Sequence, residues 1–359
     1  MFDTFKEVNR FRKYGLVLVT LLSLTGYGQR WEFNTGFGQL VPHRSTMNHM
    51  IEGPAIGFEA SHIWDTWGTK AYHEPYNNPS FGICANFFRS GSQTIIGNIY
   101  GTYGFVNFPV GKEKQLFNFR VGLGIGYVDK TFDPNTNNRN VAIGSHLNAN
   151  VVFRADKKIG DNIIVGVGAT HFSNGSYQTP NLGLNFFTAR LGFDLPLGRI
   201  SCRLPAYDYN FDNVKLDSTW HFSVSALAGV KENRNPFGGK YPIFNITANA
   251  FKQYHQKYEV IGSADIIYNP SILQAGDSTS HYSPMQAGLA LGNNFRMDRF
   301  LLSVSMGAYL FTDYKDNGKF YHKITAEYYL TDKLRATFLL KSHWAVAEYF
   351  LFGIGYTIR

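Results

Sequence analysis

The sequence predicts an all-β fold, an antiparallel transmembrane β-barrel of the outer membrane with about 12 to 16 strands. Three observations support this prediction: the composition, an export signal at the N-terminus, and a regular alternation of apolar and polar residues. The chain has 36 Gly, 22 Tyr and 31 Phe among its 359 residues, and only 17% of its residues are charged. This composition favours strands and tight turns over helical bundles.

Residues 1–29 have the order of parts that defines a secretory signal peptide. Basic residues come first, an apolar run follows from Leu16 to Leu24, and small residues end the segment. The apolar run is too short to span a bilayer as a helix. We therefore expect cleavage near Gly28 or Gln29 and export to the outer membrane of a Gram-negative bacterium.

The alternation is clearest in two segments of the chain. From Phe117 to Tyr127 the odd positions are all apolar or aromatic, whereas the even positions are Asn, Arg or Gly; from Leu302 to Ala308 apolar residues alternate with Ser and Gly. Successive side chains of a strand point to opposite sides, so each segment has one apolar face. A soluble sandwich or barrel has the same alternation. The export signal and the aromatic residues near segment ends favour the membrane barrel.

The connections between segments alternate between short and long, as periplasmic turns and outer loops do. Counting strands from a periplasmic N-terminus places the connection 173–183 outside the cell. We divide the chain into a signal peptide (1–29), a first barrel portion (30–198), a linker or periplasmic segment (199–218) and further barrel strands (219–359). One wide cylinder and an eight-strand unit with a second one attached both fit this pattern.

Three polar residues end two apolar stripes of a predicted β-hairpin. In the run 163–173, His171 and Ser173 lie on the same side as the apolar odd-numbered residues, and Asn185 begins the apolar stripe of the next strand. We expect this face to look into lipid, where a polar group without a purpose is costly. Two positions on one strand and a cross-strand partner bring the three side chains within reach of one another.

This set of residues suits nucleophilic catalysis on an ester. A serine hydroxyl is a weak nucleophile until an imidazole takes its proton, and a third group must hold the imidazole in the correct tautomer. The Asn185 amide can accept a hydrogen bond from His171, although it cannot stabilise the imidazolium by charge. The backbone amides of Asn174 and Gly175, or the Asn174 side chain, are candidate donors to an oxyanion, each worth about 3 kcal/mol in acyl-transfer enzymes.

The hairpin resembles the motif of the lipid A 3-O-deacylase family, the PagL-type acyloxyacyl hydrolases. The matching residues are His171-Phe172-Ser173-Asn174, then Pro180-Asn181, Gly183 and Asn185. In that family the matching His and Ser form a triad with a Glu, in whose place this chain has Asn185. The resemblance implies an outer-membrane barrel that hydrolyses an acyl ester of lipid A, and it adds Asn181 to the oxyanion or substrate contacts.

The same spacing is similar to the outer-membrane phospholipase A family, whose triad is Ser-His-Asn. This second resemblance implies a phospholipid substrate in the outer leaflet, calcium as a cofactor and a homodimer. The hairpin has no acidic cluster, and Ser and Asn oxygens alone make a poor calcium site. We therefore expect no cofactor, with calcium only if the protein is phospholipase-like. A non-enzymatic porin or structural barrel is the third hypothesis.

A second polar group lies near the end of the chain. Lys341, His343 and Glu348 fall at a predicted outer strand end, beside Trp344. Glu348 is an alternative acid for orienting His171. A solvated loop with an interfacial Trp is the simpler interpretation of these residues.

Four further polar residues have simpler roles. His43 and His49, in the first outer loop, are candidates for contact with a lipid headgroup. Arg190 and Asp194 lie on the opposite face from the hairpin's polar residues, and we expect them to form polar pairs inside the barrel.

Charge and cysteine content narrow the choice of partners. The formal net charge of +8 falls to about +6 without the signal peptide, an excess that suits an anionic lipid surface. The basic residues are scattered, so nucleic acid is not an expected partner. Cys84 and Cys202 form no metal-ligand pattern, and whether they pair is left open by the sequence.

Overall fold

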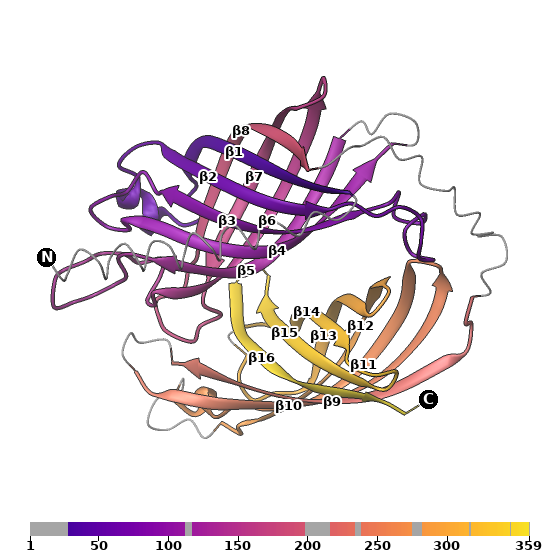
Figure 1. Cartoon of the computed structure of the whole chain (residues 1–359). Coiled ribbons are helices and arrows are strands. Elements are labelled where there is room, and N and C mark those ends of the chain that lie inside the picture. Colours follow the sequence, from indigo (N-terminus) through magenta and orange to yellow (C-terminus); the bar gives the residue numbers. More distant parts are fainter. Residues whose placement is uncertain are drawn as a thin grey trace, which may run out of the picture.

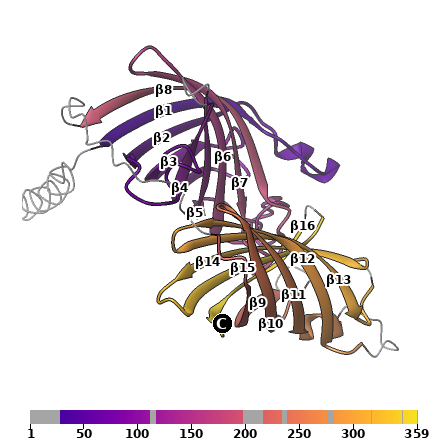
Figure 2. The same ribbon diagram turned by 90° about the vertical axis from the view of Figure 1, so that its right-hand side faces the viewer.

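The computed structural model describes residues 28–111, 117–197, 216–233, 238–274, 282–315, 317–344 and 346–358. The strands form two closed antiparallel barrels of eight strands each, which lie side by side (Figures 1 and 2). The first barrel consists of β1 (Gln29–Leu40), β2 (Ala55–Trp64), β3 (Ser80–Arg89), β4 (Asn98–Val110), β5 (Phe117–Val128), β6 (Leu147–Ile159), β7 (Ile163–Ser173) and β8 (Leu184–Leu197). The second consists of β9 (Trp220–Glu232), β10 (Lys240–His255), β11 (Tyr258–Tyr268), β12 (Met285–Met297), β13 (Phe300–Phe311), β14 (Phe320–Tyr329), β15 (Leu334–His343) and β16 (Val346–Thr357). Short 3-10 helices, among them η1 (Ser45–Met50) and η3 (Pro270–Gln274), lie in the connections.

The antiparallel barrel architecture is confirmed, but of the two arrangements that the sequence left open, the single wide barrel of about 12 to 16 strands is wrong. Within the described residues there are sixteen strands, but β8 pairs with β1 and β16 pairs with β9, so each set of eight closes on itself. Alternation and turn spacing are local signals that mark where strands run, whereas closure depends on which distant strands pair. The predicted signal peptide and most of the predicted linker fall outside the described residues, so both stay predictions.

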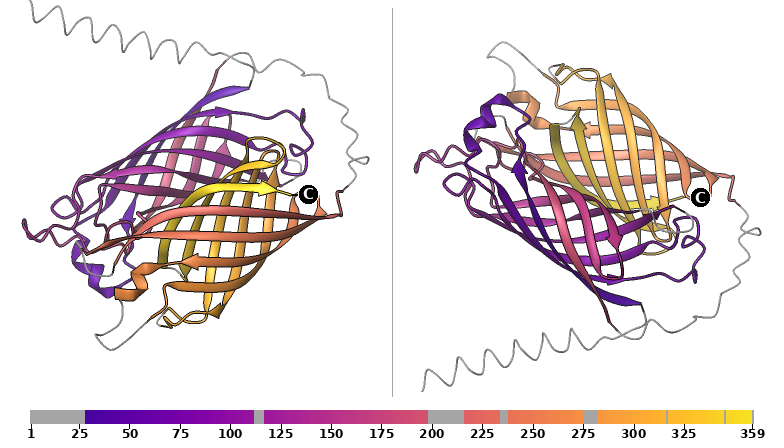
Figure 3. Two further views of the ribbon diagram at one scale, coloured as in Figure 1. Left: turned by 90° about the horizontal axis from the view of Figure 1, so that it is seen from below. Right: turned by 90° about the horizontal axis from the view of Figure 1, so that it is seen from above.

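The two barrels point the same way (Figure 3). We call the end at which odd-numbered strands finish the loop end of each barrel, and the opposite end the turn end. At the loop ends, the Ser176 hydroxyl, between β7 and β8, donates to the carbonyl of Ala347 in β16 at 3.1 Å. At the turn ends, Lys70, between β2 and β3, pairs with Asp298, between β12 and β13, at 2.8 Å. The two loop ends therefore lie on the same side of the molecule.

The outer wall of the first barrel is apolar and its interior is polar. On β7 and β8 the outward side chains include Val167 and Phe187, which are more than half exposed. Arg190 and Asp194 lie inside and are nearly fully buried, as predicted, although each pairs with other residues; Asp194, for example, contacts Lys158 at 2.9 Å. This distribution is the reverse of that in a soluble protein and matches what a barrel surrounded by lipid requires.

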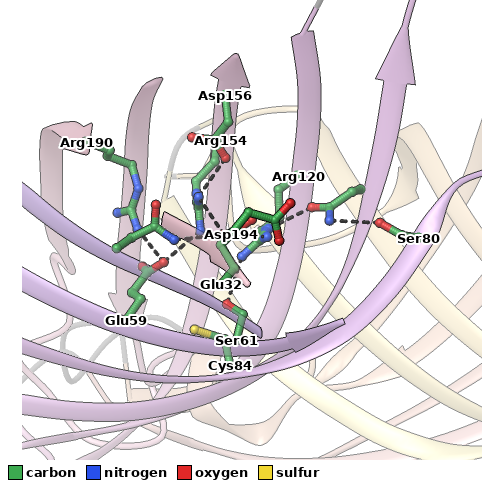
Figure 4. Close-up of polar contacts among 12 residues, drawn as sticks. Glu32, Glu59, Ser61, Ser80, Cys84, Arg120, Arg154, Asp156, Arg190 and Asp194 are labelled. Atoms are coloured by element: carbon green, nitrogen blue, oxygen red, sulfur yellow. Dashed lines mark hydrogen bonds and ion pairs between the residues drawn. The ribbon is translucent and has the colours of Figure 1, made fainter. Parts of the chain in front are cut away.

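A network of ion pairs fills the middle of the first barrel (Figure 4). Arg154 contacts Glu59 at 2.9 Å and Glu32 at 3.0 Å. Arg120 reaches Glu32 at 2.8 Å, and Arg190 pairs with Glu59. All five side chains are nearly fully buried. Removal of one partner would leave a buried charge uncompensated, at a cost of about 3 to 5 kcal/mol. Because the partners come from distant strands, the ion pairs favour the register that keeps those strands together.

An apolar cluster closes the loop end of the first barrel. Its buried members include Leu40, Met47, Met50, Phe88, Ile99, Val128, Phe172, Leu184 and Phe186. Phe172 of β7 and Leu184 of β8 point inward in this cluster, and therefore their chain neighbours His171 and Asn185 point outward. Together with the ion pairs, the cluster fills the interior, which opposes the hypothesis of an open channel through this barrel.

None of the helices in the described part of the chain is long and apolar enough to cross a membrane. Cys84 is a free, buried thiol that points into the first barrel. Cys202 lies outside the described residues, so its pairing stays open.

Candidate active site

The β7–β8 hairpin places His171 and Asn185 directly opposite each other. The imidazole Nδ1 of His171 lies 2.7 Å from the Asn185 side-chain oxygen Oδ1. Ser173 ends β7 two residues beyond His171, and so it lies on the same side of the strand. The structure thus places His171 and Asn185 in contact at the loop end of the outer wall, whereas Ser173, further along the same strand, is only 5% exposed.

The hydrogen bonds of Asn185 define the state of the imidazole. Because Asn185 Oδ1 is an acceptor, His171 carries its proton on Nδ1, and Nε2 is left free to act as a base. The amide nitrogen of Asn185 in turn donates to Nδ1 of His43 at 3.1 Å. Partial burial and the charge of Arg44 hold the pKa of His43 below its usual range, so that its neutral ring can accept this bond.

The sequence indicated His43 only as a candidate for contact with a lipid headgroup and gave no sign that it lies beside Asn185. His43 follows β1, and β1 closes the barrel against β8, which carries Asn185. The backbone amide of Val41 also donates to the Asn185 carbonyl at 2.8 Å. The position becomes evident only once the barrel is known to close after eight strands.

The Ser173 hydroxyl is held by the following loop. It lies 3.1 Å from both the oxygen Oδ1 and the nitrogen Nδ2 of the Asn181 side chain, and the backbone amide of Gly175 donates to it at 3.3 Å. Among the described contacts it makes no hydrogen bond to His171. Catalytic hydrogen bonds are often incomplete without substrate, and rotation about the Ser173 Cα–Cβ bond moves the hydroxyl.

The amide of Asn174 supports the loop. Its side-chain nitrogen donates to the Ser145 hydroxyl at 2.8 Å and to the carbonyl of Gln178 at 2.7 Å, and its backbone amide donates to Asn181 Oδ1 at 3.0 Å. The side chain of Asn174 is therefore used within the loop, whereas the amides of Gly175 and Asn181 are the donors that approach the Ser173 hydroxyl.

A glycine is required beside the imidazole. Gly183 has a φ of +81°, a conformation that favours glycine, and a Cβ atom there would come within 2.5 Å of His171 Cε1. The backbone amide of Gly183 donates to the carbonyl of Ala142 at 3.0 Å. The absence of a side chain at Gly183 thus leaves the room that the imidazole ring of His171 occupies.

The second polar group of the sequence lies inside the second barrel, not in a solvated loop. Glu348 accepts hydrogen bonds from Lys341 at 2.7 Å and from Lys231 at 3.1 Å, and it lies 3.3 Å from His343 Nδ1. A register shift between β15 and β16 turns Glu348 inward, and this irregularity is not visible in the alternation, whereas Lys341 and His343 take regular inward positions of β15. Glu348 is therefore engaged within the second barrel, and Asn185 is the residue that contacts His171. Trp344 is exposed.

His49 lies away from these residues, where its Nε2 contacts the carbonyl of Arg139 at 2.9 Å. Within the described residues no group of three or more His, Cys, Asp or Glu side chains is placed to hold a metal ion.

Fold and site together define a β-barrel protein with a His–Asn pair on the outer wall and a serine two residues along the same strand. Residues 52–194, in the first barrel, match the family described as lipid A 3-O-deacylase (PagL), and residues 219–359, which include the second barrel, match the acyloxyacyl hydrolase C-terminal domain. The chain belongs to this family of hydrolases that act on lipid A esters. The predicted resemblance to this family is thereby confirmed.

Solved structures of other barrels are only remotely similar. Two mutants of the Rhodopseudomonas blastica porin are 10% and 9% identical to this chain, with TM-scores of 0.18 and 0.19. In both cases the likeness covers 92% of this chain and 99% of the porin. No curated protein matches the chain.

Proposed function

We propose that the protein is an outer-membrane esterase that removes an ester-linked acyl chain from lipid A by a Ser-His-Asn mechanism. The observation that carries this proposal is the 2.7 Å contact between His171 and Asn185 on the outer wall, two residues from Ser173. An imidazole with one nitrogen fixed and the other free, next to a hydroxyl, is the arrangement that nucleophilic ester cleavage needs.

Rotation of the Ser173 side chain away from Asn181 brings its hydroxyl toward Nε2 of His171. His171 takes the proton as Ser173 Oγ attacks the ester carbonyl, and a tetrahedral intermediate forms. Its collapse breaks the bond to the sugar oxygen, which leaves with the proton from His171 as a free hydroxyl. Water then attacks the acyl-serine with His171 as the base, and the fatty acid leaves as Ser173 regains its proton.

The negative charge of the intermediate needs hydrogen-bond donors close to the serine. The backbone amide of Gly175 and the side-chain amide of Asn181 already lie 3.3 Å and 3.1 Å from Ser173 Oγ. When the hydroxyl rotates, these donors are released toward the carbonyl oxygen. Each such donor is worth about 3 kcal/mol in acyl transfer.

The position of the set on the barrel supports a lipid substrate. The wall below it is apolar, and a barrel with apolar exterior and polar interior suits a bilayer. In the proposed orientation the acyl chain approaches this end of β7 from the hydrocarbon, while the sugar headgroup stays at the level of the loops. The loop end then faces the outer leaflet, where lipid A lies.

A phospholipase activity is the second candidate, because the third residue is Asn185 and not a glutamate. An amide orients the imidazole without stabilising its charge, as in the Ser-His-Asn set of the outer-membrane phospholipase A family. The family match to lipid A 3-O-deacylase over residues 52–194 favours lipid A over phospholipid.

Mass spectrometry of lipid A from cells with and without the protein tests the proposal. We expect the loss of one acyl chain with the wild type and no loss with Ser173→Ala, while the variant barrel still shows heat-modifiable migration. Unchanged lipid A with release of lysophospholipid supports the phospholipase instead. Hydrolysis by Ser173→Ala at the wild-type rate overturns the mechanism.

A further inference from the structure

The second barrel contacts the loop between β7 and β8 at successive residues. A Cβ atom on Gly175 would lie only 2.4 Å from the ring carbon Cδ2 of Phe350 on β16, so this ring packs directly against the glycine. The Ser176 hydroxyl donates to the Ala347 carbonyl at 3.1 Å. The ammonium of Lys240, at the start of β10, lies 3.8 Å from the centre of the Tyr177 ring.

Glu232, the last residue of β9, makes the most extensive of these contacts. Its carboxylate oxygen Oε2 accepts hydrogen bonds from both the backbone amide and the hydroxyl of Thr179, the latter at 2.8 Å. Its own backbone amide donates to the carbonyl of Ser176 at 2.9 Å. The side chain is only 3% exposed. A charge-assisted pair of bonds shielded from water is among the stronger polar contacts in proteins.

The segment that Glu232 holds is the one that surrounds the nucleophile. Thr179 lies two residues before Asn181, whose amide contacts the Ser173 hydroxyl and the Asn174 backbone. The Gln178 carbonyl, next to Thr179, accepts from the Asn174 side chain at 2.7 Å. A shift of Thr179 therefore moves the donors that lie beside Ser173.

We propose that the second barrel positions the catalytic loop of the first, and that Glu232 is the positioning residue through which it acts. This inference rests on the proposed ester hydrolysis at Ser173. The first barrel supplies the nucleophile and base on its own strands, and the second barrel supplies the fixed point for the oxyanion donors. An error of about 1 Å in such a position can lower a rate about 100-fold.

The test compares Glu232→Ala with Glu232→Gln in the full chain, on purified lipid A in detergent micelles. Glu232→Ala removes both bonds to Thr179, and we expect kcat to fall about 10- to 100-fold with KM within about twofold of the wild type. Both bonds end on one oxygen, so the carbonyl of Gln can accept them. Glu232→Gln should therefore keep kcat within about threefold of the wild-type value.

Asp298→Asn is the matched control. It removes the ionic contact with Lys70 between the turn ends of the barrels and leaves the loop ends untouched. Asn also tolerates the positive φ of 55° at this position. We expect wild-type kcat and KM for this variant, which separates loop positioning from a general loosening of the two barrels.

Amide hydrogen exchange gives a readout that does not depend on activity. In Glu232→Ala the amides of residues 174–181 should exchange faster, while those of β7 and β9 keep their protection. Unchanged exchange together with wild-type kcat in Glu232→Ala overturns the inference. A wild-type protein without any esterase activity refutes the proposed function instead, and the exchange measurement still decides whether Glu232 holds the loop.

Discussion

Replacement of Asn185 by Ala tests whether the amide orients the catalytic imidazole. The variant removes the acceptor 2.7 Å from His171 Nδ1. In the transition state His171 becomes an imidazolium, and a hydrogen bond to a charged group is worth about 1.5 to 3 kcal/mol. Loss of about 2 to 3 kcal/mol corresponds to a fall in kcat of about 30- to 160-fold.

The assay is hydrolysis of defined lipid A by the purified variant in detergent micelles, with heat-modifiable migration as the check on barrel folding. KM should change little, because the amide touches the base and not the acyl chain. Asn185→Glu restores an acceptor and adds a charge that stabilises the imidazolium, so kcat should equal or exceed the wild-type value. A kcat for Asn185→Ala within threefold of the wild type would refute the orienting role, and complete loss in Asn185→Glu would show that the donor to His43 is needed.

Three further predictions concern the surroundings of the site. Gly183→Ala places a methyl group against His171 at a positive φ, so it should lower kcat about 10- to 100-fold and the free energy of unfolding by about 1 to 2 kcal/mol. Turnover and urea unfolding measure these two effects, and wild-type values for both would contradict the steric argument. Arg154→Met removes a partner from three carboxylates of the first barrel, those of Glu32, Glu59 and Asp156. Urea unfolding in micelles should show a loss of about 3 to 5 kcal/mol, whereas a stability equal to the wild type would mean that the network is not a structural requirement. Protonation of His43 as the pH falls makes its Nδ1 a donor and breaks the hydrogen bond from Asn185. The fall of kcat/KM at acid pH should therefore depend on two protons in the wild type, one on His171 and one on His43, and on a single proton in His43→Gln. Identical acid pH profiles for the two proteins would exclude this role of His43.

The alternation of the sequence was sufficient to predict the faces of the hairpin. The apolar odd-numbered residues of 163–169 and His171 are more exposed than the inward Thr170 and Phe172, and Arg190 points inward, because strand side chains alternate in direction. Ser173, at the end of the strand, is buried. The pairing of His171 with Asn185 follows from the same rule and from the length of the connecting loop. The sequence therefore sufficed to predict that His171 and Asn185 face each other, whereas the role of Ser173 stays a prediction.

Closure into two barrels could not be predicted in the same way. The pairing of β1 with β8 joins residues more than 140 positions apart in the chain, and no local pattern distinguishes it from continued growth of one sheet. The position of His43 beside Asn185 depends on that closure. The inward turn of Glu348 depends on a bulge, which shifts side chains by one position and defeats a rule based on alternation.

The hydrogen bonds between Ser173 and Asn181 have a consequence for an enzyme that is embedded in its own reactant. In a membrane the local concentration of lipid is so high that the encounter rate is seldom what limits turnover. On the proposed mechanism, a hydroxyl held by the Asn181 amide, away from its base, would keep the resting protein inactive until a suitable ester displaces that amide. The contact with Asn181 would then limit hydrolysis of the other lipids of the leaflet, and the substrate selectivity of the protein would depend on which lipid can displace the amide.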